Sequence, residues 1–198
     1  LAVAKDGAAG RMYPRSKKLS PDDVIKEADA LGYQHVEHTF EPVFDEHSKV
    51  LILGSFPSVK SREEGFYYGH PQNRFWRLLA RLTDEEIPET IEEKKTLLLK
   101  HQIAIWDVVH SCDIVGSSDS SIKNVVPCEL EKVLSSSPIR QIYANGGKAW
   151  QLYHRYCEKE TGREAVKLPS TSPANAIFTL DRLTAVWGEE LFGKQNTK

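Results

Sequence analysis

Polar and aromatic side chains follow four short apolar segments of this sequence, at the points where strands of a sheet would end. The apolar segments are residues 50–53, 103–109, 139–144 and 165–168. The loops next to their ends are residues 54–73, 106–121, 145–148 and 169–175. Because ligands of open α/β sheets bind at the carboxyl ends of the strands, we expect these loops to form one pocket. Their amide, hydroxyl and aromatic groups, with Asp107 and Asp113 as the main carboxylates, suit a flat polar ring held by stacking and by hydrogen bonds to its edge.

The pattern between the apolar segments predicts the helices that would position these strands. Phe75, Leu78, Leu79 and Leu82 recur at the spacing of one helix face. The predicted helices cover residues 74–82, 91–101, 129–134, 148–159 and 179–191. Strands that alternate with helices form parallel sheets covered on both faces. The sequence therefore predicts an α/β protein, a three-layer α/β/α sandwich with a central four-stranded parallel sheet.

The N-terminal segment has a different composition. Residues 1–19 are rich in Ala, Gly and Lys, which predicts a loose arm. Ser20 and Pro21 are suited to the N-cap and first position of a short helix, which we expect to end near Gly32. We therefore divide the chain into an arm with a short helix, residues 1–35, and a single domain, residues 36–198.

Composition limits the classes of partner. A net charge of −2 gives no general attraction to a polyanion, so contact with nucleic acid would need a local basic surface. No apolar run approaches the roughly 18–20 residues that cross a bilayer, and the N-terminus lacks the apolar core of a signal peptide. Three cysteines, an odd number, do not make a disulfide framework. We expect a cytoplasmic protein with no membrane role.

Motifs for several other kinds of site are incomplete. Gly146-Gly147-Lys148 lacks the upstream glycine and the following Ser or Thr of a P-loop, and the sequence holds no GxSxG elbow. Cys128 lacks the second cysteine of a zinc deaminase, and no HExxH pair is present. The sequence therefore predicts neither a metal nor a cofactor.

Three blocks of the sequence resemble the uracil-DNA glycosylase superfamily. They are GSFPS at residues 54–58, FYYGHPQNRFW at residues 66–76 and LPSTSPAN at residues 168–175. Within the superfamily the sequence looks most like the DNA-deoxyinosine (hypoxanthine-DNA) glycosylases, close to the mismatch-specific uracil-DNA glycosylases. The resemblance runs from about residue 36 to residue 191, and it implies a glycosylase-like catalytic domain over residues 36–198.

The resemblance implies base excision without a covalent lysine intermediate. The damaged nucleotide is flipped out, water attacks the sugar and the base leaves. The implied substrate is deoxyinosine in DNA, from which hypoxanthine is released and an abasic site remains. The implied partner is DNA with deaminated bases, bound by a monomer. Removal of uracil or xanthine is an alternative, and so is a non-catalytic α/β module that binds a nucleotide or a nucleic acid.

Asn73 matches the functional Asn of the family, and the resemblance implies that it is the main catalytic side chain. Its amide would hold the attacking water or bond the base. It is no general base near neutral pH, since an amide has no accessible proton equilibrium there. An Asn directly before a helix is also well suited to cap it, so both interpretations stay open.

Five residues are assigned to the base pocket. Tyr68 matches the aromatic residue that stacks beneath the flipped base, whereas Phe56 departs from the catalytic Asn or Asp usual at its position and favours the deoxyinosine branch. Core packing is the alternative for Phe56. Asp107 would accept a hydrogen bond from purine N1–H, which hypoxanthine has and adenine lacks, or it braces a loop. His70 and Asn145 complete the pocket, or they shape the loop and the helix entry.

Residues 169–175 match the loop with which the family enters the minor groove. Pro173 and Ala174 occupy the wedge positions, and Ser170, Ser172 and Asn175 would donate to phosphate or base. The alternative is a Ser/Pro turn between a strand and a helix. The predicted phosphate contacts are Lys60, Arg62 and Lys148, with Arg74 and Lys123 as further cations beside these loops.

Overall fold

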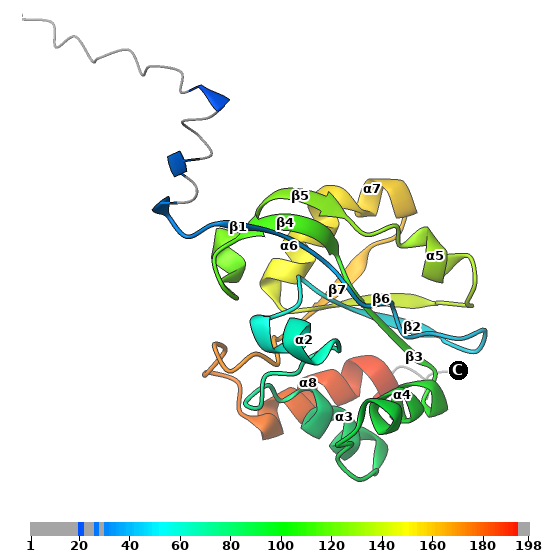
Figure 1. Ribbon diagram of the computed structural model, residues 1–198. Coiled ribbons are helices and arrows are strands. Elements are labelled where there is room, and N and C mark those ends of the chain that lie inside the picture. The colour runs from blue at the N-terminus through cyan, green and yellow to red at the C-terminus, as the bar shows by residue number, and fades with distance from the viewer. Residues whose placement is uncertain (1–19, 22–25, 28–29, 194–198) are drawn as a thin grey trace, which may run out of the picture.

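The computed structural model describes residues 20–21, 26–27 and 30–193 (Figure 1). The predicted arm, residues 1–19, lies outside the described residues, and so does much of the short helix expected after it. Pro21 and Ala30 are helical, and Gly32 ends this region with a φ of 73°. The boundary predicted between residues 35 and 36 falls within the first strand, β1 (Gln34–Glu37), and the division into arm and domain stays a prediction.

The central sheet has four parallel strands, as predicted. Their order is β3 (Ile103–Asp107), β2 (Val50–Gly54), β6 (Gln141–Asn145) and β7 (Ala165–Leu168). The middle strands read as nearly continuous apolar runs because both faces of the sheet are covered: Leu51, Ile52 and Leu53 are fully buried. All four carboxyl ends therefore meet at one edge.

Helices cover the two faces of this sheet, which confirms the three-layer arrangement (Figure 1). On one face lie α3 (Phe75–Thr83), α4 (Ile91–Lys100) and α8 (Leu180–Phe192). On the other lie α5 (Glu131–Leu134), α6 (Gly147–Tyr156) and α7 (Glu158–Thr161). Trp187 of α8 and Phe75 of α3 are fully buried and pack edge to face, so the aromatic residues of these helices join them beneath the sheet.

The strand predicted over residues 103–109 is in fact two strands in two sheets. After β3 the chain turns at Val108, whose N–H donates to the carbonyl oxygen of Gly54, and continues as β4 (Val109–Ile114). This strand is the centre of a small antiparallel sheet with β1 and β5 (Lys123–Pro127). Hydrophobicity alone did not reveal that sheet, because its outer strands are largely exposed and carry few apolar residues.

Shorter elements also differ from the sequence predictions. The segment after β2, expected as a loop, contains α2 (Val59–Glu64), which Ser58 caps and left-handed Gly65 ends. A helix of six residues with Ser61 as its buried residue presents no apolar stripe to recognise. The helix expected over residues 148–159 is divided at Cys157 into α6 and α7. A 3-10 helix, η1 (Asp119–Ser121), follows β4. In the described part of the chain, no helix is long and apolar enough to cross a membrane.

The register of the central sheet places Gly54 directly beside Asp107 at its carboxyl edge. A Cβ atom at residue 54 would lie 2.2 Å from Oδ1 of Asp107. Only glycine allows the carboxylate to approach the end of β2 so closely.

We expect Gly54→Ala to lower the free energy of unfolding by about 1–3 kcal/mol, because the new methyl group must displace the Asp107 carboxylate or the strand. Gly147→Ala is the matched control: no atom lies within 4 Å of its added Cβ, so a change within about 1 kcal/mol is expected. Urea denaturation of both variants measures the difference. Equal stability of the two variants would contradict the close approach.

Candidate functional site

A pocket of about 290 Å³ opens at the carboxyl edge of the central sheet. It brings together all the residues predicted for the base pocket and most of the predicted DNA-binding loop. The predicted residues in its lining are Phe56, Tyr68, His70, Asn73, Asp107, Asn145, Ser170, Ser172, Pro173 and Ala174. The lining excludes Asn175 and the three lysine and arginine residues predicted to contact phosphate.

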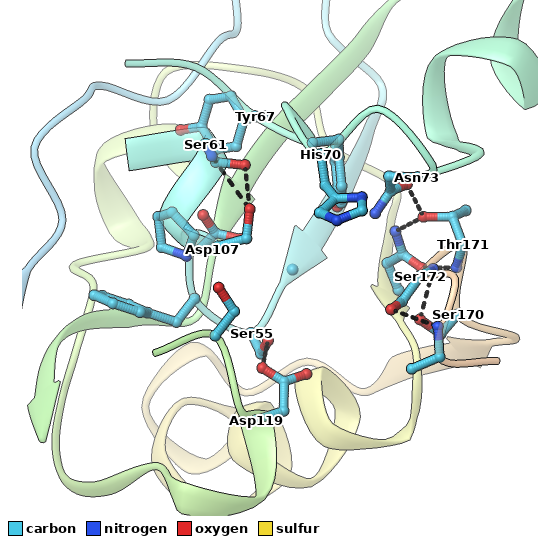
Figure 2. A pocket seen from close by; sticks show the side chains of 18 of the residues that line it. Ser55, Ser61, Tyr67, His70, Asn73, Asp107, Asp119, Ser170, Thr171 and Ser172 are labelled. Carbon is cyan, nitrogen blue, oxygen red and sulfur yellow. Dashed lines mark hydrogen bonds between the residues drawn. The ribbon is translucent and has the colours of Figure 1, made fainter. Parts of the chain in front are cut away.

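The side chain of Asn73 has a fixed orientation. Its Oδ1 accepts hydrogen bonds from the backbone N–H of Phe75, at 3.0 Å, and from the hydroxyl of Thr171, at 2.8 Å. Because a backbone N–H only donates, the oxygen must face Phe75 and the NH₂ group must face away. Figure 2 shows that nitrogen directed toward the pocket, and it makes no hydrogen bond with the described residues.

This orientation assigns separate tasks to the two ends of the Asn73 amide. Arg74, at the N-cap position of α3, provides no side-chain cap, and the Asn73 oxygen instead satisfies the first free N–H of the helix. The NH₂ group remains available to a ligand in the pocket. Asn73 is therefore equipped to act as a hydrogen-bond donor while its oxygen supports the helix.

Thr171, which the sequence did not single out, connects three segments at the pocket wall. It is fully buried, and its hydroxyl accepts from Nδ2 of Asn145, at 3.0 Å, while donating to Asn73. Its backbone N–H donates to Oδ1 of Asn145, also at 3.0 Å. Both ends of the Asn145 amide are thus used within the protein, so Asn145 fixes the loop after β7.

Arg74 holds that loop from below, and the expectation that it contacts phosphate is wrong. Its guanidinium donates to the carbonyl oxygens of four loop residues, which are Thr171, Ser172, Asn175 and Phe178. The distances from Nη2 to Ser172 and Asn175 are 2.6 Å and 3.1 Å. With its donors directed inward, Arg74 determines the shape of the loop.

The loop after β7 is also stabilised by its own polar side chains. Ser170 and Ser172 accept the N–H groups of Ser172 and Ala174, and the Asn175 amide donates to the carbonyl oxygen of Ser170. The most exposed large apolar side chain of the described residues, Ile177 at 75% exposure, lies on the same loop. Ile177 was not singled out from the sequence, and the wedge positions Pro173 and Ala174 stay a prediction.

Tyr68 forms an aromatic wall of the pocket in an unusual backbone conformation. Its φ is 54°, which is strained for a bulky residue. One face of its ring stacks on Phe75, with ring centroids 3.9 Å apart. Its buried hydroxyl lies near the Asn145 amide but has no hydrogen bond of acceptable geometry within the described residues. Burial, and secondarily the charge of Asp107, raise the pKa of this hydroxyl well above its usual range, so it stays a neutral donor.

Asp107 lies beside Tyr68 and is paired with a histidine that the sequence analysis did not place in the site. One carboxylate oxygen accepts from Nε2 of His38 at 2.8 Å, and the two side chains are 6% and 2% exposed. Phe40, Tyr67 and Phe56 surround the His38 ring. Phe56, 7% exposed, therefore belongs to the core as well as to the pocket wall. Sequence spacing gave no signal for this pair, which joins two sheets.

A second carboxylate, Asp119, also lines the pocket, and it was not singled out from the sequence. Its Oδ1 accepts from the hydroxyl of Ser55 at 2.8 Å, as Figure 2 shows. Desolvation by the surrounding atoms of the pocket raises the pKa of the Asp119 carboxyl, and the negative charge of Asp107 raises it further. The hydrogen bond from Ser55 and the positive charge of Lys148 act in the opposite direction. The pocket thus holds two carboxylates that come from different loops.

The predicted phosphate contacts have different surroundings. The guanidinium of Arg62 lies over the Phe56 ring and donates to the carbonyl oxygen of Gly116, while its contact with phosphate stays a prediction. Lys60 is exposed and pairs with Glu63, and Lys123 lies over the ring of Tyr33. Lys148, near the start of α6, stays a predicted contact.

His70 keeps one ring nitrogen for a ligand. Its Nδ1 accepts from the N–H of Gln72 at 3.2 Å, so a neutral ring would carry its proton on Nε2. Among residues 30–193 and the few described before them, no cluster of three or more His, Cys, Asp or Glu side chains is placed to hold a metal ion. The pocket chemistry is that of hydrogen-bond donors, two carboxylates and aromatic walls.

Comparison with known proteins places this arrangement in a family. A family model described as the uracil DNA glycosylase superfamily matches residues 41–189. A protein named hypoxanthine DNA glycosylase from Methanosarcina acetivorans is 36% identical over 149 residues, which cover 74% of this chain and 93% of the relative. Its namesake from Methanosarcina barkeri is 32% identical over 152 residues, covering 76% and 94%.

A solved structure agrees with the sequence comparisons. The solution NMR structure of a Methanosarcina acetivorans protein, described as a candidate uracil DNA glycosylase, matches with a TM-score of 0.65 and 33% identity. The match covers 79% of this chain and 97% of that protein. With its parallel sheet, the pocket at the carboxyl edge and these similarities, the chain belongs to the uracil DNA glycosylase superfamily.

Proposed function

We propose that this protein is a DNA glycosylase that releases hypoxanthine from deoxyinosine in DNA and leaves an abasic site. The observation that carries the proposal is the free NH₂ group of Asn73, fixed toward a pocket that also presents an acceptor, Asp107. Two relatives at 32–36% identity that bear the name hypoxanthine DNA glycosylase support it.

The reaction needs stabilisation of two opposite charges. As the glycosidic bond breaks, its electron pair leaves with the purine, while the sugar becomes an oxocarbenium-like cation that bonds to a water oxygen. A donor fixed in advance stabilises the negative charge of the leaving base more than it stabilises the uncharged substrate. The Asn73 NH₂ group is such a donor, because its oxygen is tied to Phe75 and Thr171 before any ligand binds.

The base lies, in this proposal, on the side of the Tyr68 ring that does not face Phe75. Ring stacking would hold any flat base, so selection among bases must come from hydrogen bonds to the edge. Asp107 accepts from N1–H of hypoxanthine, with its orientation fixed by His38.

The loop after β7 is proposed to enter the duplex. Pro173 and Ala174 line the pocket, and Ile177 supplies the larger apolar surface needed to fill the space that a flipped nucleotide leaves. Because Arg74 holds the loop by four carbonyl oxygens, the loop needs little ordering on binding. Lys148 and Lys60 are proposed to contact phosphate, and the protein is proposed to act as a monomer on deaminated DNA.

Removal of uracil or xanthine is the alternative within the superfamily. All three bases present an N–H beside a carbonyl group, but in the single ring of uracil this N–H lies nearer the sugar than in the two purines, so an Asp107 held by His38 suits the purines better. A substrate panel of duplexes with hypoxanthine, uracil or xanthine, assayed for release of the free base, tests the proposal. Binding without release of any base would contradict an enzymatic function and would support a non-catalytic binding module.

Asn73→Asp separates the cap from the donor. Asp keeps an oxygen for Phe75 and Thr171 but replaces the NH₂ donor, so we expect normal folding and a loss of about 10²–10³-fold in single-turnover hypoxanthine release. Gln72→Glu, an exposed neighbour, controls for the added negative charge. If Asn73→Asp retains the wild-type rate, Asn73 is only a cap.

Asp107→Asn tests base selection. The amide can present a donor where the carboxylate accepts, so we expect the ratio of hypoxanthine to uracil release to change by at least about tenfold, equivalent to about 1.4 kcal/mol for one hydrogen bond. Rates on both substrates, measured with the same preparation, give the ratio. A uniform loss on both bases would assign Asp107 to structure and not to selectivity.

Ile177→Ala tests the wedge. We expect a decrease of about tenfold or more in release from a duplex, where the stack must be opened, and little change on single-stranded DNA, where it need not. Ile87→Ala, another exposed isoleucine, is the matched control. The same loss on both kinds of substrate would remove Ile177 from this role.

A further inference from the structure

Phe56 itself offers no polar group to the attacking water in the turn after β2, because its side chain is an apolar, buried ring. The adjacent pocket wall carries a carboxylate from a different part of the chain. We propose that Asp119 holds and deprotonates the attacking water and faces the developing positive charge on the sugar. This inference rests on the proposed glycosylase function and adds to it the group that acts on the sugar side of the bond.

The first observation is the position of the carboxylate. Asp119 lines the pocket, and its Oδ1 accepts from the hydroxyl of Ser55, the residue directly before Phe56 (Figure 2). Its Oδ2 makes no hydrogen bond with the described residues. Asp119 thus presents a free carboxylate oxygen beside the turn in which Phe56 cannot orient water.

The second observation is that the Asp119 loop is attached to the turn and to α2. The Ser117 hydroxyl accepts from the N–H of Val59 at 2.8 Å, and the carbonyl oxygen of Gly116 accepts from Arg62 at 3.2 Å. Ser121 closes the loop internally, accepting from the N–H of Val115 at 2.9 Å. Arg62, assigned to phosphate from the sequence, thereby becomes one of the supports that position Asp119.

The third observation is electrostatic. Three groups face the Asp119 carboxyl from different elements, which are Asp107 at the end of β3, Lys148 in α6 and the neutral hydroxyl of Ser55. Two carboxylates in one pocket repel each other, and a positive charge that develops on a sugar beside Asp119 reduces that repulsion. The raised pKa of Asp119 agrees with a carboxylate that accepts a proton more readily than one in water.

The proposed step is balanced as follows. The water oxygen forms a bond to C1′, the C1′–N9 bond breaks, and its electron pair leaves with the purine. Asp119 takes the proton of the water and afterwards returns it to the leaving base or to solvent, so the enzyme is regenerated without any further reactant. Asn73 stabilises the base at the other end of the same bond.

Asp119→Asn tests the proposal without removing the loop contact, because the amide oxygen still accepts from Ser55. We expect single-turnover hypoxanthine release to decrease by about 10²-fold or more, with DNA binding no weaker. Wild-type activity should fall as the pH drops through the raised pKa of Asp119, since protonation removes the base, and this fall should be absent in the variant. Asp113→Asn, a carboxylate of β4 outside the pocket lining, is the matched control with unchanged rate.

Stability and a second variant distinguish catalysis from loop support. A carboxyl whose pKa is raised by folding is disfavoured as an anion in the native state, so Asp119→Asn should be no less stable than wild type at neutral pH. If Asp119 only supports the loop through its hydrogen bond with Ser55, then Ser55→Ala, which removes that bond, should lower the rate of hypoxanthine release by about 10²-fold. In that case Asp119→Asn, which keeps the bond, should retain the wild-type rate. That pattern would overturn the proposal while the glycosylase function stands. Absence of free base from the wild type would overturn the proposed function and this inference together.

Discussion

The hydrogen bonds of one buried hydroxyl, that of Thr171, are the constraint on which the pocket depends. Thr171 joins the end of β6 through Asn145, the start of α3 through Asn73 and the loop after β7 through its own backbone. Each buried polar group needs a partner, so none of these segments can move without leaving another unsatisfied. The direction of these hydrogen bonds is fixed, because the backbone N–H groups of Phe75 and Thr171 can only donate, to Asn73 and Asn145 respectively. The result is an Asn73 donor that is positioned before a ligand arrives.

Two arginine side chains near the pocket also donate hydrogen bonds to the protein itself. Arg74 donates to four carbonyl oxygens of the loop after β7, and Arg62 donates to the carbonyl oxygen of Gly116. These hydrogen bonds give both arginines a part in ordering the loops around the pocket. With a net charge of −2, attraction to phosphate needs local cations, of which Lys148 is a proposed one. The salt dependence of DNA affinity scales with the number of phosphates that the protein contacts, so a few lysine contacts predict a modest dependence.

The pocket presents different groups to the two halves of the proposed substrate. Asn73 provides a donor and Asp107 an acceptor for the edge of the base, whereas Asp119 provides negative charge on the wall formed by the loop after β4. This arrangement suits a bond that breaks into a negative base and a positive sugar, because the Asn73 donor faces the base and the Asp119 carboxylate faces the sugar. The strained φ of Tyr68 and the exclusion of any side chain at Gly54 agree with a site whose geometry is kept at a cost in stability.

The sequence by itself determined the parallel sheet, most of its helices and the family, because continuous apolar runs and three motif blocks are local signals. The sequence also indicated most residues of the pocket wall, since the three motif blocks lie at or after the carboxyl ends of strands. Only the tertiary structure decided the small antiparallel sheet and the pairs His38–Asp107 and Ser55–Asp119, which join residues 69 and 64 positions apart. Only the tertiary structure shows that Arg74 donates to the loop after β7, and that the Asn73 oxygen caps α3 while its NH₂ group faces the pocket. Contacts between distant residues depend on how loops pack, and no spacing in the sequence records that packing.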